Sequence, residues 1–98
     1  MTESLFDFYQ NTLKSHQYKT FSMVSIAKSE KYSGIGYIVD WVCAIFWMKN
    51  GELHRLDGVA YVSKQTYGYW IHNKSYSEIN FWNHPLVIEN KLNQIIKL

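Results

Sequence analysis

Residues 46–55 read FWMKNGELHR, and residues 69–76 follow the same pattern as YWIHNKSY, 23 positions further along the chain. Both stretches run through an aromatic residue, a tryptophan, an apolar residue, a polar residue and an asparagine in that order. A second pair of similar segments lies upstream: residues 33–38 read SGIGYI and residues 57–62 read DGVAYV, at a spacing of 24. A fixed period of this size is typical of one supersecondary unit that is copied along the chain and packs on its neighbours. We therefore interpret residues 31–76 as roughly two and a half copies of such a unit.

Turn signals indicate how this unit folds. The dipeptides Asn-Gly at 50–51 and Asp-Gly at 57–58 are strong hairpin signals, because type I′ turns need a positive φ at both central residues. Between residues 37 and 62 the apolar runs are short and are bounded by these dipeptides, which predicts an antiparallel meander. We expect a further bend at residues 67–68 and a last strand at 69–71.

The N-terminal part of the chain predicts a helix and then a strand. A capping Ser4 or Thr2 precedes apolar residues that recur at three- and four-residue spacing, which is typical of an amphipathic helix ending near residue 15. These residues are Leu5, Phe8, Tyr9, Thr12 and Leu13. Residues 18–27 are rich in β-branched and aromatic types, so we expect the first strand there.

Helical periodicity returns after Tyr76. Ser77 is a suitable N-cap that is followed by an acid, and Pro85 fits the first turn of a further helix. Four apolar residues form a stripe along that helix, namely Ile88, Leu92, Ile95 and Ile96. We expect the stripe to pack over one face of the sheet. The alternative is that the helix binds a partner or forms a dimer.

These elements predict an α+β fold in one domain of 98 residues. Its centre is an antiparallel β-meander of about four to six strands, built from repeats of about 23 residues and flanked by helices at both ends. We expect a helix over residues 1–16, the β-repeat sheet over 18–76 and a C-terminal helical segment over 77–98.

Composition limits the partners that the chain can take. Four tryptophans, eight tyrosines and five phenylalanines are more large rings than a domain of this size readily hides, so we expect some of them at a ligand site or subunit interface. The net charge of +2 permits an anionic partner. It does not provide the dense basic stripe of a domain that binds duplex DNA sequence-specifically.

Other classes of site and location lack sequence support. Four histidines are spread irregularly without a cysteine pair or carboxylate cluster, and a lone G-x-G lacks the third glycine of a phosphate loop, so we expect no metal and no cofactor. The single Cys43 is interpreted as a small buried hydrophobe. Glu3 and Asp7 stand where a signal peptide needs positive charge, and no run of about 20 apolar residues suits a membrane span. We therefore expect a cytoplasmic protein that does not contact membranes.

The candidate catalytic or anion-binding residues are His54, Arg55 and Asp57. In an extended segment His54 and Arg55 point to opposite faces, whereas Arg55 and Asp57 share a face and can form an ion pair that braces the turn at 57–58. The functional alternative is that Arg55, the one arginine of the chain, clamps a phosphate or carboxylate.

The motif W-x-x-N-G-x-x-H-R-x-D-G-x-A runs from Trp47 to Ala60. It resembles the W-x-x-N-G-x-x-H-R-x-D-G-P-A repeat of small proteins from tailed bacteriophages and some large DNA viruses. The chain departs from that repeat at Val59, which replaces proline, and at Lys74, which replaces glycine in the second copy. The resemblance implies a viral origin, action on host components in the host cytoplasm, and no defined catalytic residues.

Two classes of function follow. The first is a non-enzymatic phage-type binding protein that blocks or sequesters a host component, such as an element of antiviral defence. Its partner would be a host protein or a small anionic nucleotide, and its site a sheet face in a homodimer or larger assembly. The expected site residues are Trp47, His54, Arg55, Tyr69 and Trp70. The alternative is a small enzyme or nuclease using His54 and nearby acids, although the sequence shows no nucleophile paired with a base. A structural virion component is a third, weaker interpretation.

Overall fold

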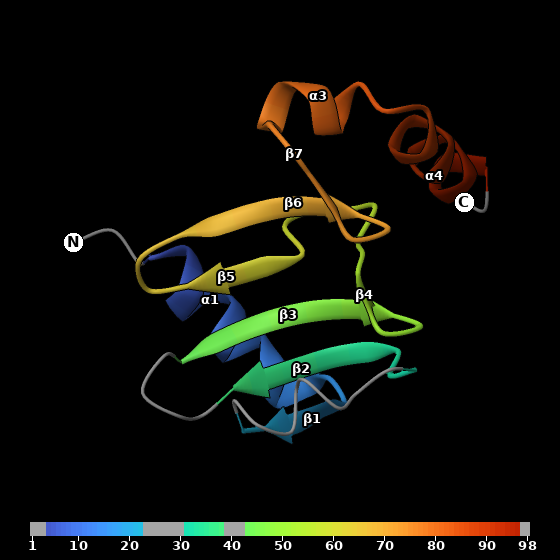
Figure 1. The fold of residues 1–98 in the computed structure, drawn as a ribbon. Coiled ribbons are helices and arrows are strands. Elements are labelled where there is room, and N and C mark those ends of the chain that lie inside the picture. The colour runs from blue at the N-terminus through green and yellow to red at the C-terminus, as the bar shows by residue number, and fades with distance from the viewer. Residues whose placement is uncertain (1–3, 23–30, 39–42, 97–98) are drawn as a thin grey trace.

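The structure, a computed structural model, describes residues 4–22, 31–38 and 43–96. It is a mixed α and β fold in which helices flank one sheet (Figure 1). Helix α1 (Leu5–Thr12) continues as the short 3-10 turn η1 (Leu13–Ser15) and leads into the sheet, and two helices follow the sheet. The strands are β1 (Tyr18–Phe21), β2 (Gly34–Ile38), β3 (Ala44–Lys49), β4 (Glu52–Leu53), β5 (Tyr61–Ser63), β6 (Tyr67–Ile71) and β7 (Lys74–Tyr76). The C-terminal helices are α3 (Glu78–Trp82) and α4 (Pro85–Ile96).

The sheet contains seven strands within the described residues, in the order β1-β2-β3-β5-β6-β7, with β4 pairing with β3 as well. All the pairs are antiparallel except β1 with β2, which run parallel. The meander is therefore confirmed from β2 onward, while the parallel first pair was not predicted. The expected first strand begins at Tyr18 and ends at Phe21, and its predicted continuation over 23–27 lies outside the described residues.

Two tight hairpins connect neighbouring strands. Asn50 and Gly51 have φ values of 52° and 80° and join β3 to β4, which confirms the predicted turn. His72 and Asn73 have φ values of 48° and 67° and join β6 to β7. Measured from the preceding tryptophan, the second turn comes one residue earlier than the first. Lys74 is therefore the first residue of β7 and does not need the positive φ that Gly51 adopts.

The second predicted hairpin, at 57–58, is wrong. Asp57 and Gly58 have no positive φ, and β4 and β5 do not pair with each other, because both pair with β3. The loop between them, residues 54–60, leaves the edge of β3 and returns to it. The loop wraps around the Arg55 side chain so closely that a Cβ on Gly58 would lie 3.1 Å from the guanidinium carbon.

Two further expectations about the strands fail. Residues 67–68 belong to β6 instead of forming a bend, and the last strand is β7 instead of residues 69–71. The chain turns before β6, where the Ser63 hydroxyl accepts hydrogen bonds from the amides of Gln65 and Thr66. A side-chain turn of this kind carries no glycine or proline signal.

The two faces of the sheet have separate cores, because side chains alternate along each strand. On one face Ile45 packs with the α1 residues Phe6 and Tyr9, and α1 lies behind the sheet in Figure 1. On the other face Phe46 packs with Phe21 and Ile38.

The helices begin largely where the sequence predicts. Ser4 caps α1 by accepting from the Asp7 amide, and Ser77 caps α3 by accepting from the Asn80 amide. Pro85 is the first residue of α4. The predicted apolar row is confirmed in part, because Leu13 is buried and Tyr9 and Thr12 are half-buried, whereas Leu5 and Phe8 are exposed. Phe6, which the row does not include, is the buried residue of α1.

The expectation that the stripe on α4 covers the sheet is wrong. Val87 is the buried residue of α4, whereas the stripe residues Ile88, Leu92, Ile95 and Ile96 are all exposed. Among the described residues, none of the helices combines the length and apolar character needed to cross a membrane.

Candidate functional site

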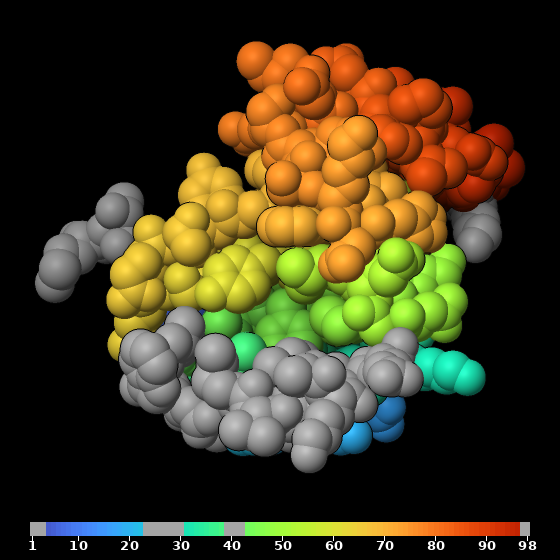
Figure 2. Space-filling view, in the orientation of Figure 1, coloured from blue at the N-terminus to red at the C-terminus, as the bar shows by residue number. Residues whose placement is uncertain are grey.

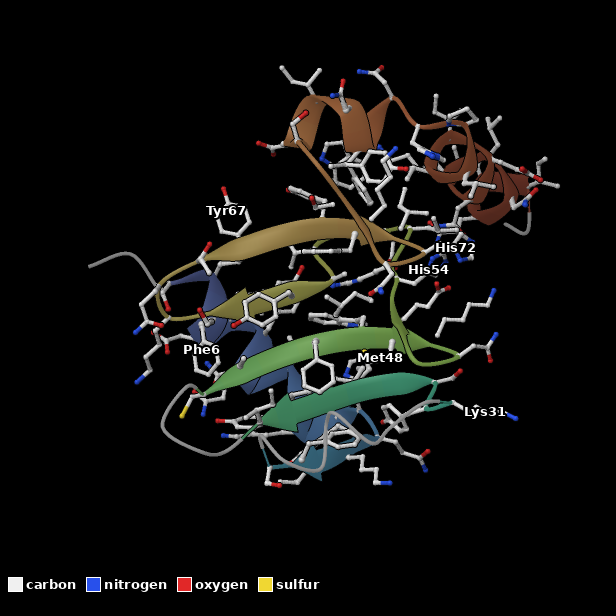
Figure 3. All side chains as sticks on the ribbon, viewed as in Figure 1. Phe6, Lys31, Met48, His54, Tyr67 and His72 are labelled. Atoms are coloured by element: carbon white, nitrogen blue, oxygen red, sulfur yellow. The ribbon has the colours of Figure 1, made fainter. Side chains whose placement is uncertain are left out.

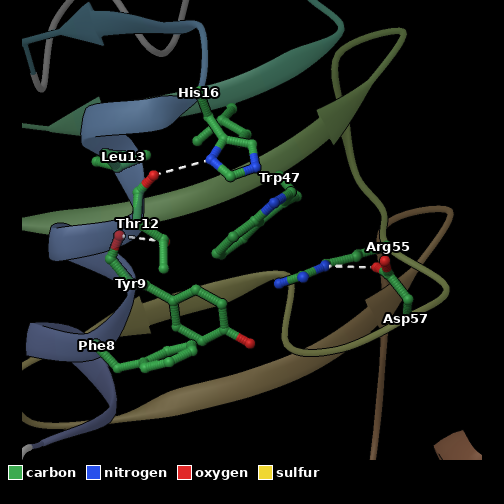
Figure 4. A pocket seen from close by; sticks show the side chains of 9 residues that line it. Phe8, Tyr9, Thr12, Leu13, His16, Trp47, Arg55 and Asp57 are labelled. Atoms are coloured by element: carbon green, nitrogen blue, oxygen red, sulfur yellow. Dashed lines mark hydrogen bonds and ion pairs between the residues drawn. The ribbon is translucent and has the colours of Figure 1, made fainter.

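A cleft of about 430 Å³ lies where α1 faces β3 and the 54–60 loop (Figure 4). We call it the aromatic cleft. Helix α1 and the residues that follow it contribute Phe8, Tyr9 and His16, and β3 contributes Trp47. Arg55 and Asp57 complete the lining from the loop. The cleft therefore contains two of the predicted site residues, Trp47 from the sheet and Arg55 from the loop.

Arg55 is held from several sides. Its Nε donates to Asp57 Oδ1 at 2.7 Å, and its Nη1 donates to the Val59 carbonyl at 3.0 Å. The guanidinium carbon lies 4.2 Å from the ring centroid of Trp47 and 5.3 Å from that of Tyr9. These contacts confirm the predicted ion pair with Asp57. They also mean that the positive charge is already balanced inside the loop.

Polar groups with capacity to bind a ligand remain at this site. The His16 Nδ1 atom lies 2.8 Å from the Thr12 carbonyl, and because a carbonyl can only accept, Nδ1 carries the proton and leaves Nε2 as an acceptor in the neutral ring. No hydrogen bond within the described part of the chain uses Arg55 Nη2. Lysine is absent from the described residues that line the cleft. The cleft thus offers donors and acceptors with little net positive charge.

His54 lies elsewhere, beside the β6–β7 turn (Figure 3). Its Nδ1 accepts a hydrogen bond from the His72 amide at 3.0 Å, and the two imidazole centroids are 4.2 Å apart. His72 Nδ1 is 3.4 Å from Glu52 Oε1. Burial lowers the pKa of His54, nearby His72 and Lys49 lower it further, and Glu52 opposes them. His54 therefore ties the 54–60 loop to the hairpin in its neutral form.

The last two predicted site residues point to opposite faces of β6. Tyr69 is buried beneath α3, with its ring centroid 4.6 Å from that of Phe81 and its hydroxyl 3.4 Å from Glu78 Oε1. Burial and the Glu78 charge raise the pKa of Tyr69. Trp70 is half-buried, and its Nε1 would lie 2.9 Å from a Cβ on Gly68. Backbone hydrogen bonds join His54 to Trp47 at 3.0 Å and Arg55 to Trp70 at 3.1 Å. Of the five predicted side chains, however, only those of Trp47 and Arg55 line the aromatic cleft.

No protein family model, curated protein or solved structure matches this chain. The site must therefore be understood from its own geometry. Within ranges 4–22, 31–38 and 43–96, no three His, Cys, Asp or Glu side chains are placed to hold a metal ion.

A second surface lies on α4. Its stripe residues are turned away from the body, with exposed fractions of 44%, 53%, 64% and 78% for Ile88, Leu92, Ile95 and Ile96. We call these four residues the outward face of α4. In Figure 2 the orange and red residues of α3 and α4 form a lobe at one end of the molecule.

The side of α4 that approaches the 54–60 loop is more polar. Glu89, Asn90 and Asn93 line a cleft of about 200 Å³ together with Leu56 and Leu86. An amphipathic helix that completes its own domain normally does the reverse, with its apolar stripe inward and its polar side in water. In α4 the apolar stripe lies in solvent, and residues 91–96 are exposed on every side of the helix, so nothing in the described part of the chain covers the stripe.

Sequence reasoning missed the contribution of α1 to the aromatic cleft. The helix predicted over residues 1–16 includes Phe8, Tyr9 and His16, but nothing in their spacing places them beside Trp47. The available signal was the aromatic pair Phe8-Tyr9 on one short helix, because adjacent helical side chains project about 100° apart and one of the two rings can then be left at the edge of the core.

Proposed function

We propose that this protein is a non-enzymatic binding protein that blocks or sequesters a host component, and that it docks on a partner protein through the outward face of α4. The observation that carries the proposal is the exposed apolar stripe of α4, a helix that buries Val87 and leaves Ile88, Leu92 and Ile95 in solvent.

The arrangement of these side chains suits a helix that lies in an apolar groove. Ile88, Leu92 and Ile95 follow the i, i+4, i+7 spacing by which amphipathic helices anchor in such grooves. Fully burying one such side chain contributes roughly 1.5–3 kcal/mol, so three or four of them supply a substantial part of a binding free energy. The same side chains left in water are a liability for a protein that acts alone.

Arg55 bears on the choice between a protein partner and a small anionic nucleotide. Its guanidinium is paired with Asp57 and with the Val59 carbonyl, so binding a phosphate would require competition with existing partners. This favours docking on a host protein over a phosphate clamp. The resemblance of the Trp47 motif to a bacteriophage repeat supports a host target, including an element of antiviral defence.

The alternative of a small enzyme or nuclease has less support. A general base at His54 would need an unprotonated ring nitrogen beside a nucleophile, whereas Nδ1 accepts from the His72 amide and Nε2 therefore carries the proton of the neutral ring. The two nearby acids have other partners than His54: Asp57 pairs with Arg55, and Glu52 pairs with His72.

Affinity capture from cells expressing the tagged protein tests the proposal. The double variant Leu92→Asp, Ile95→Asp is compared with the matched control Asn93→Asp on the same helix. We expect a stoichiometric host protein with the wild type and the control, and its loss with the double variant. Retention of that protein by the double variant would refute docking through α4. Capture of only further copies of the chain would refute the host target.

A further inference from the structure

We propose that the aromatic cleft binds an uncharged planar heteroaromatic ring of the nucleobase type, held by stacking and by its hydrogen-bonding edge and not by a phosphate. This site is separate from the outward face of α4 and does not depend on the proposed function.

The walls of the cleft are aromatic planes. Tyr9 and Trp47 meet edge to face, with centroids 5.0 Å apart and an interplanar angle of 74°. Phe8 stands edge to face on Tyr9 at 5.2 Å and is 50% exposed at the rim. Exposed aromatic rings and guanidinium planes are the surfaces on which bases stack, whatever their sequence.

The polar groups of the cleft match the edge of such a ring. His16 presents an acceptor through Nε2, and Arg55 retains the Nη2 donors. The carboxylate of Asp57 adds acceptors and is half exposed. A volume of about 430 Å³ lies in the range of small-ligand sites, which are mostly apolar with a few convergent polar groups.

The charge of the cleft excludes a large contribution from phosphate. Asp57 lies 2.7 Å from the Arg55 Nε and offsets its charge. A phosphate entering the cleft would meet this carboxylate without gaining an unpaired cation. A nucleoside and its monophosphate should therefore bind with similar affinity.

Ligand-observed NMR with the full chain tests this site. The probes are the four ribonucleosides, their 5′-monophosphates and a short single-stranded oligonucleotide, since a base of this chemistry can come from a free nucleoside or from a strand. The test variant is Phe8→Ala. The matched control is Tyr67→Ala, because Tyr67 is 53% exposed, lies on β6 (Figure 3) and does not line the cleft.

We expect at least one nucleoside to bind, its monophosphate to bind within about threefold, and Phe8→Ala to weaken binding about tenfold while Tyr67→Ala does not. Tighter binding of the oligonucleotide than of any nucleoside that binds, weakened by Phe8→Ala only, identifies a strand as the source of the base and supports the proposal. Binding of monophosphates without nucleosides would overturn it. So would equal effects of the two variants, or no binding of any probe at millimolar concentration.

Discussion

The guanidinium of Arg55 lies over the indole ring of Trp47, with its central carbon 4.2 Å from the ring centroid. This stack attaches the 54–60 loop to the face of the sheet that α1 covers. It also forms one wall of the aromatic cleft (Figure 4). The Arg55 side chain thus stabilises the loop by donating hydrogen bonds to Asp57 and to the Val59 carbonyl. Its remaining donors are available in the cleft.

Arg55→Ala is expected to lower the free energy of unfolding by about 2 kcal/mol, because it removes an ion pair, a carbonyl hydrogen bond and a cation–π stack. Arg55→Lys should recover only part of this, since an ammonium group lacks the planar fork that makes both hydrogen bonds. Urea unfolding of the three proteins measures the effect. Wild-type stability in Arg55→Ala would show that the loop does not need the guanidinium.

Gly51→Val is expected to cost on the order of 1 kcal/mol or more, because a β-branched residue resists the φ of 80° found there. Lys74→Val is the matched control, since Lys74 stands 23 positions later but adopts an ordinary strand conformation. Guanidinium unfolding should separate the two variants clearly. Equal losses of unfolding free energy in the two variants would mean that positions 51 and 74 occupy the same place in their hairpin turns.

The stability of the protein should fall below about pH 6.5 because of His54. The pKa of His54 is lowered in the fold, chiefly by burial, so the unfolded chain binds this proton at a higher pH than the folded chain does. The free energy of unfolding then decreases as pH falls from the ordinary value of 6.5 toward the lower pKa of the folded state.

Urea unfolding between about pH 7.5 and about pH 5 measures this dependence. In His54→Gln the decrease should be smaller, because the titrating ring is gone. An identical pH dependence in the variant would assign the effect to other groups.

Two substitutions on α4 should differ sharply in their effect on stability. Val87→Ala removes buried methyl groups and should cost about 1–2 kcal/mol. Leu92→Ala, on the outward face, should change the free energy of unfolding by less than about 0.5 kcal/mol. Thermal unfolding of the isolated protein compares them. A large loss in Leu92→Ala would place the outward face inside the fold.

Local sequence signals predicted much of the fold. Asn50-Gly51, Ser77 and Pro85 each act through backbone geometry or capping, which depends on neighbours in sequence, and each was found where predicted. The Arg55–Asp57 pair succeeded for the same reason, because the two residues are only two positions apart.

Features that depend on tertiary packing were not predictable. The composition of 57–58 suggests a hairpin, but the loop closes around the Arg55 side chain, which lies over the Trp47 ring of β3. Periodicity identified the stripe on α4 without showing which way it faces. Tyr69 and Trp70 looked equivalent in sequence, yet strand alternation buries one under α3 and turns the other to the opposite face.

The most direct test of docking through α4 is photo-crosslinking in the cells that express the protein. A photoreactive phenylalanine analogue is placed at Leu92 on the outward face, or at Asn93 on the side of α4 that faces Leu56. We predict a crosslinked product of one defined mass, containing a host protein, from position 92 and little or none from position 93. Equal crosslinking from both positions, or none from position 92, would contradict the account.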